Sequence, residues 1–174
     1  MNKNVIRQPK DKKMKETKFE FNYKVYDSIE ELDEQEQWLL NEAREVTANA
    51  YAPYSHFQVG AVARLANGEI ITGSNQENAS FPVGLCAERV LLASASSVFP
   101  RVPVDVIAIS YKGEGHASDH PISPCGICRQ SLQEFESRLG HPIKMILGGM
   151  TGVVYVIDSA KLLLPLAFTS EELR

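Results

Sequence analysis

Two short stretches, "GLCAERVLL" (residues 84–92) and "PCGICRQSL" (residues 124–132), contain all three cysteines of the chain. In each stretch a cysteine precedes a run with apolar residues at helical spacing, which predicts the start of a helix. Exposed N–H groups at a helix start favour thiolate over thiol, and thiolate is the form of cysteine that binds zinc. If the two helix starts face each other, Cys86, Cys125 and Cys128 form a site with three sulfurs.

The segments around these two helices predict an α/β fold. The tripeptide "ANG" (66–68) between two apolar segments is a strong hairpin signal, and strands interleaved with helices predict a layered domain with helices on both faces of one sheet. Ser28 and Asp33 are both candidate caps for the first helix, whose inward side is predicted to carry Trp38, Leu39, Ala43 and Val46. The predicted strands are 18–26, 57–65, 69–76, 105–111, 143–149 and 152–158, and the predicted helices are 28–50, 86–98, 125–137 and a short one within 159–168.

Length and composition indicate one globular domain with an N-terminal arm. The chain has 174 residues, of which 44% are hydrophobic and 23% charged, both ordinary values for a folded protein. The sequence contains no apolar run long enough to span a membrane and no apolar core of a signal peptide at its start, so we expect a cytoplasmic protein. Thiols stay reduced there, and three cysteines cannot all pair with one another, which disfavours a disulfide framework.

Charge is distributed unevenly along the chain. Residues 1–18 contain seven Lys or Arg and two acidic residues, whereas the rest contains 11 and 20. A basic tail can contact nucleic acid, but no aromatic residue precedes Phe19, which favours a solubilising, disordered arm over residues 1–17. The acidic body argues against a groove for a polynucleotide. We therefore expect three parts: the arm, an extension with a short strand at 18–33, and the main domain at 34–174.

The sequence alone allows more than one interpretation of the three cysteines. A C-x-x-C motif also serves redox chemistry and structural zinc, and the cysteines could simply be buried small residues. Structural zinc usually has four protein ligands, and His120 near the second motif could supply the fourth. A C-x-E motif upstream of the C-x-x-C narrows the choice, because a catalytic zinc keeps one position free for water.

The combination "CAE…PCGICRQ" resembles the zinc-dependent nucleoside deaminases of the small homotetrameric cytidine deaminase type. Further stretches match this family in the same order: "YAPYSHFQVGAV" (51–62), "GSNQENASFPVGLCAER" (73–89), "SPCGICRQ" (123–130) and "LLLPLAF" (162–168). The resemblance covers roughly residues 34–173. The sequence departs from the family at Phe81, where Tyr is usual, in the loop 112–122, and in the first 33 or so residues.

The resemblance implies a three-layer α-β-α sandwich with a mixed central sheet and one Zn²⁺ per chain on Cys86, Cys125 and Cys128. It implies hydrolytic deamination of cytidine and deoxycytidine to uridine and deoxyuridine with release of ammonia, in pyrimidine salvage. Glu88 would move the protons. The alternatives are a deaminase of another small aminated heterocycle or of a nucleic-acid base, and a non-catalytic zinc module. The non-catalytic zinc module is disfavoured, because Glu88 is present together with only three zinc ligands.

The resemblance also assigns substrate contacts. Without it, Phe57 would be taken as a core residue, and Asn75 and Glu77 as turn-capping and solvated residues. It implies a homotetramer with shared active sites, and a small nucleoside substrate with no membrane or nucleic-acid partner. The implied roles are ribose binding by Asn75 and Glu77, stacking on the base by Phe57, backbone contact with the base by Ala87, contacts across subunit boundaries by Ala79, Phe81 and Phe168, and donation to the sulfurs by Arg89.

Overall fold

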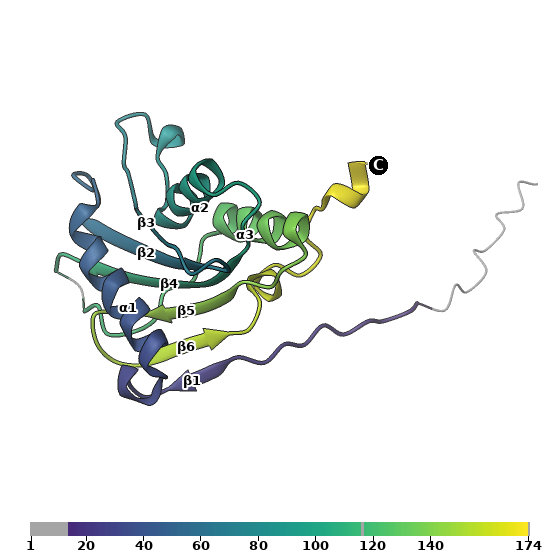
Figure 1. Cartoon of the computed structure of the whole chain (residues 1–174), viewed down its shortest axis with the longest axis horizontal. Helices are drawn as coiled ribbons and strands as arrows, with labels where there is room; N and C mark the ends of the chain where they lie inside the picture. The colour runs from purple at the N-terminus through teal and green to yellow at the C-terminus, as the bar shows by residue number, and fades with distance from the viewer. Residues whose placement is uncertain (1–13, 116, 174) are drawn as a thin grey trace, which may run out of the picture.

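The computed structural model describes residues 14–115 and 117–173. Most of the arm predicted over residues 1–17 therefore lies outside the described residues. The described chain forms one six-stranded sheet in the order β1-β6-β5-β4-β2-β3, in which β4 and β5 are parallel and the other neighbours antiparallel (Figure 1). The strands are β1 (Lys24–Tyr26), β2 (Phe57–Leu65), β3 (Ile70–Ser74), β4 (Val104–Gly113), β5 (Lys144–Gly148) and β6 (Val154–Ile157), and the α-helices are α1 (Glu34–Val46), α2 (Ala87–Val98) and α3 (Gly126–Leu139).

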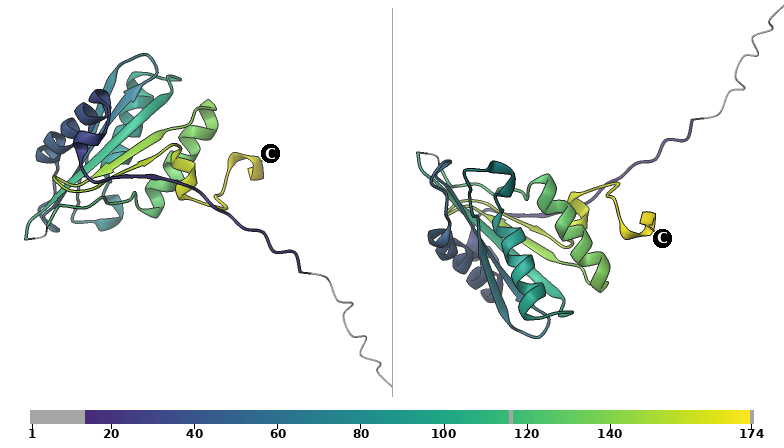
Figure 2. Two further views of the ribbon diagram at one scale, coloured as in Figure 1. Left: turned by 90° about the horizontal axis from the view of Figure 1, so that it is seen from below. Right: turned by 90° about the horizontal axis from the view of Figure 1, so that it is seen from above.

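The sheet lies between two layers of helix, which confirms the predicted three-layer fold. Helix α1 covers one face, where Leu40 and Ala43 pack with Val62, Val106 and Ile146 of the sheet. Helices α2 and α3 cover the opposite face, as the two views of Figure 2 show. No helix in the described part of the chain is long and apolar enough to cross a membrane.

The first predicted helix is shorter than expected. Asp33 is its cap, because the Asp33 side chain accepts a hydrogen bond of 2.8 Å from the backbone N–H of Glu36, whereas Ser28 makes no capping bond. Trp38, predicted to point inward, is 46% exposed, and the neighbouring Leu40 is fully buried instead. The apolar spacing allowed either residue, and packing of α1 against the sheet selected Leu40.

Other predicted elements also have different bounds. The strand expected at 18–26 pairs with β6 only over β1, since the extended residues before Lys24 have no neighbouring strand. Strand β4 is longer than the predicted 105–111 because it pairs with β2 along nearly its whole length. The short C-terminal helix is a 3-10 turn at Ala160–Leu163, and a second such turn follows at Ser170–Leu173.

The two helix starts that carry the cysteines are held by the fold. Cys86 is the residue directly before α2, and Cys125 is the residue directly before α3. Helix α2 approaches β3 so closely that a Cβ atom at Gly73 would lie 2.5 Å from the carbonyl oxygen of Ala87. Only glycine permits this approach, so the first turn of α2 is fixed against the sheet.

Candidate active site and metal centre

The three cysteine sulfurs form one cluster. Cys86 Sγ lies 3.8 Å from Cys125 Sγ, which lies 3.5 Å from Cys128 Sγ, and the three atoms are all within 4.8 Å of one another. Cys128 is buried in the first turn of α3, whereas Cys125 is exposed. His120, the alternative fourth ligand, lies instead beside Tyr111 and Asp119, with its ring nitrogens 3.3 Å from the tyrosine hydroxyl and 3.1 Å from the carboxylate.

The cluster fits zinc. Sulfurs at about 2.3 Å from a tetrahedral zinc are about 3.8 Å apart, close to the two sulfur distances observed here. Contact with the Cys128 thiol lowers the pKa of Cys86 to about 6, and the same contact together with burial raises the pKa of Cys128. Zinc binding would displace the thiol protons, because thiolate is the form of cysteine that binds the metal. Cys86, Cys125 and Cys128 can hold one zinc ion.

Glu88 lies beside the sulfurs, in the first turn of α2. Its side chain is 5% exposed, and burial raises the pKa of its carboxyl group. Cys86, whose backbone is extended, directly precedes the helix, and its side chain and that of Glu88 line the same cavity. A buried carboxyl group next to a metal site is a suitable group for accepting and returning a proton.

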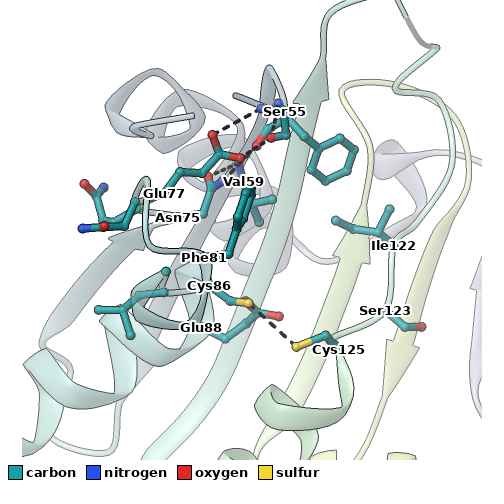
Figure 3. A pocket seen from close by; sticks show the side chains of 15 residues that line it. Ser55, Val59, Asn75, Glu77, Phe81, Cys86, Glu88, Ile122, Ser123 and Cys125 are labelled. Carbon is teal, nitrogen blue, oxygen red and sulfur yellow. Dashed lines mark hydrogen bonds between the residues drawn. The ribbon is translucent and has the colours of Figure 1, made fainter. Parts of the chain in front are cut away.

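A cavity of about 540 Å³ connects these residues with a second group of polar side chains. This volume lies within the range of small-molecule binding sites. Figure 3 shows Cys86, Cys125 and Glu88 at one end, which we call the metal end together with Cys128. Ser55, Asn75 and Glu77 lie at the other, which we call the polar end. Phe57, Phe81, Leu85 and Ile122 add apolar surface between them.

The polar end is tied together by its own hydrogen bonds. The Glu77 carboxylate accepts from the Ser55 hydroxyl and, at 2.8 Å, from the backbone N–H of Tyr54. The bond from Ser55 is the main reason why the pKa of Glu77 is lowered. The Asn75 amide accepts from the backbone N–H of Val59 at 2.8 Å and donates to the carbonyl oxygen of Phe57, also at 2.8 Å. Asn75 and Glu77 therefore shape the start of β2 as well as lining the cavity.

Phe57 lines the cavity rather than joining the core, and its ring stacks on Tyr111 of β4. Phe81 also lines the cavity; it is 77% exposed, and its ring centroid lies 6.2 Å from that of Tyr54. Ala87 is fully buried at the start of α2. The cavity thus brings together most of the residues proposed from the sequence.

Ala79, Arg89 and Phe168 do not line the cavity. The charge of Arg89 is close enough to Cys86 to help lower the pKa of that thiol. Among the described residues, however, Arg89 makes no hydrogen bond to the three sulfurs, and it lines a separate groove with Ser96 and Phe135. Ala79 is exposed on the loop that leads to Phe81. Phe168 is 59% exposed, and its carbonyl oxygen accepts a 2.8 Å bond from the side chain of Gln130 on α3.

Sequence reasoning did not single out Ser55, Tyr111, Ile122 or Ser123. Ser55 stands in the matched stretch "YAPYSHFQVGAV", so its position near Phe57 could have been noticed. Ser123 begins the matched stretch "SPCGICRQ", so its position two residues before Cys125 could also have been noticed. Tyr111 ends a strand that looks uniformly buried, and Ile122 belongs to the loop that departs from the family. Nothing local marks these two positions as belonging to a site.

Known proteins resemble this chain over its main domain. The family profile described as "Cytidine and deoxycytidylate deaminase zinc-binding region" matches residues 33–139. A cytidine deaminase of Halalkalibacterium halodurans is 39% identical over 137 residues, which are 79% of this chain and 96% of that protein. The crystal structure of cytidine deaminase from Burkholderia pseudomallei superposes with a TM-score of 0.67 at 37% identity, covering 79% of this chain and all of that one. The cytidine deaminase of Mycobacterium tuberculosis gives 0.60 at 30% identity, covering 78% of this chain and 98% of that one. The chain belongs to the family of zinc-binding cytidine and deoxycytidylate deaminases.

Proposed function

We propose that this protein hydrolyses cytidine and deoxycytidine to uridine and deoxyuridine, with release of ammonia. The observation that carries the proposal is the buried Glu88 carboxyl group beside three converging cysteine sulfurs at one end of a cavity of nucleoside size. Relatives named cytidine deaminase, similar over nearly their whole length, support the choice of substrate.

Cys86, Cys125 and Cys128 would hold the zinc ion. Zinc held there supplies Lewis acidity, which lowers the pKa of water enough to provide a nucleophile near neutral pH. Glu88 would accept a proton from the attacking water and give it to N3, and would then take the second proton from the C4 hydroxyl group and give it to the departing amine. A C–O bond forms at C4 and the C–N bond breaks, so water and cytidine give uridine and ammonia. Burial of Glu88 keeps bulk water away from this proton.

The polar end would hold the sugar. A carboxylate has about four acceptor positions, so Glu77 can accept from a ribose hydroxyl while it keeps its bonds to residues 54 and 55. Asn75 has one amide hydrogen and one acceptor position beyond its two bonds to β2. Phe57 would stack on the pyrimidine, and the backbone of Ala87 would contact its edge.

The substrate would be a free nucleoside. A phosphate near the Glu77 carboxylate would be repelled, and the acidic body would repel longer strands. We place the reaction in pyrimidine salvage in the cytoplasm, with the deaminase domain at 34–174 and an arm at 1–17 that takes no part in the reaction.

The active protein would be a homotetramer in which Ala79, Phe81 and Phe168 reach neighbouring sites. Phe168 and Leu166 are both exposed, and none of the described residues covers Leu166, which supports this arrangement. Arg89 would support the cysteine sulfurs after zinc binds.

Ammonia release from cytidine, zinc content and molecular mass by light scattering test these proposals together. The expected result is turnover of cytidine by a tetramer with one zinc per chain. Zinc-loaded protein that releases no ammonia from cytidine would contradict the proposed activity. A fully active monomer would contradict the shared sites alone.

A further inference from the structure

Tyr111 packs against Phe57 from outside the cavity. It is 2% exposed, it is not among the described residues that line the cavity, and its ring centroid lies 5.0 Å from that of Phe57 at an interplanar angle of 24°. In the antiparallel ladder between β2 and β4, Tyr111 is opposite Val59. Phe57 is two residues from Val59 on the same face of the sheet, so the stack is a diagonal cross-strand pair.

The other side of Tyr111 meets the loop before α3. The His120 ring packs edge-on at a centroid distance of 5.8 Å, and the tyrosine hydroxyl lies 3.3 Å from a His120 nitrogen and 3.4 Å from the carbonyl oxygen of Ala117. These polar contacts are long for bonds from a hydroxyl group, so ring packing is the stronger part of the interaction. Tyr111 therefore lies between Phe57 and the loop.

This loop is anchored to the turn between β5 and β6. The carbonyl oxygen of Ser118 accepts a 2.6 Å bond from the backbone N–H of Met150, and the Ser118 hydroxyl accepts from Gly113 at 3.1 Å. The turn lies so close that a Cβ atom at Gly149 would be 2.3 Å from the Ser118 carbonyl oxygen. The surface that Tyr111 contacts is thus fixed by backbone packing.

The same loop continues through Ile122 and Ser123, which line the cavity, to Cys125 at the metal end. Phe57, in contrast, is the first residue of β2 and has cavity space on one side. A side chain whose rotamer is already fixed loses less conformational entropy when a ligand stacks on it.

We propose that Tyr111 is a positioning residue that fixes the plane of the Phe57 ring and relates it to the loop ending at Cys125. This inference rests on the proposed function, in which Phe57 stacks on the pyrimidine. Tyr111 touches no substrate and acts through Phe57. Its contribution is made equally to bound substrate and transition state, so it changes binding more than the rate of the bound complex.

Kinetics on cytidine and calorimetric binding of uridine test this role in the zinc-loaded protein. Tyr111→Leu is expected to raise KM and the uridine Kd about fivefold, the size of one aromatic pair, with kcat within about twofold. Tyr111→Phe keeps the ring and is expected to restore both constants. If Tyr111→Leu does not fold, Tyr111→Met, which fills more of the volume without a ring, takes its place with the same expectation.

Tyr155→Leu is the matched control, because it also removes a tyrosine ring, one that packs on Tyr23 at 5.1 Å and does not line the described cavity. It is expected to leave KM and the uridine Kd unchanged. A double-mutant cycle with Phe57→Leu then shows whether Tyr111 acts through Phe57: in that background Tyr111→Leu should have no further effect.

The positioning role would be overturned by an unchanged KM in Tyr111→Leu or by an equal rise of KM in Tyr155→Leu. It would also be overturned if Tyr111→Leu had its full effect on KM in the Phe57→Leu background. In these cases the wild-type protein still deaminates cytidine, so the proposed function stands. A wild-type protein with neither turnover nor uridine binding would overturn the proposed function and this role with it.

Discussion

At the metal end of the cavity the functional atoms come from two helix starts, and Cys86 and Cys125, 39 residues apart in sequence, meet at 3.8 Å. At the polar end they come from the residues just after β3 and from the turn before β2, and their side chains bond to the backbone of that turn and of β2. The metal end therefore depends on how α2 and α3 dock, whereas the polar end is held by hydrogen bonds that accompany the pairing of β2 with β3. We expect substitutions at the metal end to abolish nearly all activity, and substitutions at the polar end to reduce substrate binding or selectivity only in part.

Removing a ligand should have the largest effect. Cys86→Ala is expected to lose both zinc and cytidine turnover, because two remaining thiolates form no stable site for a metal that prefers four ligands. Zinc content by mass spectrometry and ammonia release measure the two losses. Ser97→Ala, an exposed change on the same helix, is the control. Full zinc and full turnover in Cys86→Ala would show that the ligands are assigned wrongly.

Glu88→Gln should separate metal binding from proton transfer. The amide keeps the size of the side chain but cannot carry the proton, so zinc content should stay at the wild-type level. The rate should fall on the order of 10²–10⁴-fold, the usual contribution of a general acid–base group. Single-turnover kinetics at saturating cytidine measure the rate. Activity within tenfold of wild type would remove Glu88 from the mechanism.

A substitution at the polar end should have a smaller effect, and this effect should be on the selectivity for cytidine over its 5′-monophosphate. Two like charges about 5 Å apart at an effective dielectric of about 20 repel by roughly 3 kcal/mol, so wild-type protein should use the 5′-monophosphate on the order of a hundredfold less well than cytidine. Glu77→Gln removes the charge and should narrow that ratio while zinc content is unchanged.

The ratio of kcat/KM for the two substrates at low salt is the measurement. Ser55→Ala is a useful companion, because it removes a bond to Glu77 but leaves the carboxylate charge in place. It should weaken cytidine binding while preserving discrimination against phosphate. Equal use of both substrates by the wild-type protein would contradict the role given to Glu77.

The smallest effect is expected from the arm at residues 1–17, which precedes the family match. Deletion of residues 1–17 should leave turnover of cytidine within about twofold, because the family match begins at residue 33 and residues 14–17 are exposed. Steady-state kinetics and light scattering on the truncated protein check this. A loss of assembly or activity would show that the arm packs on a neighbouring subunit.

The sequence alone was sufficient for the parts of the protein that are set locally. The helix starts at Cys86 and Cys125, the hairpin at residues 66–68 and the alternation of strands and helices are properties of short segments, and each was found where expected or within a few residues. The C-x-x-C motif combined with the upstream C-x-E was likewise enough to favour a zinc site, because residues three apart at a helix start lie on one face, as Cys125 and Cys128 do.

Tertiary structure decided what depends on pairing between distant segments. Trp38 and Leu40 were both compatible with an inward position on α1, and only packing against the sheet buried one of them. Asn75 holds β2 through bonds that depend on strand register. Tyr111 stacks on Phe57 because of strand register and the anchoring of the neighbouring loop, and no short sequence pattern predicts either feature. The sequence by itself thus determined the candidate metal ligands, since these follow from residue type and spacing, and its resemblance to the family supplied the role of Glu88 and the substrate contacts. The fold determined how those groups are held, since contacts across the sheet and between helices exist only once the layers have packed.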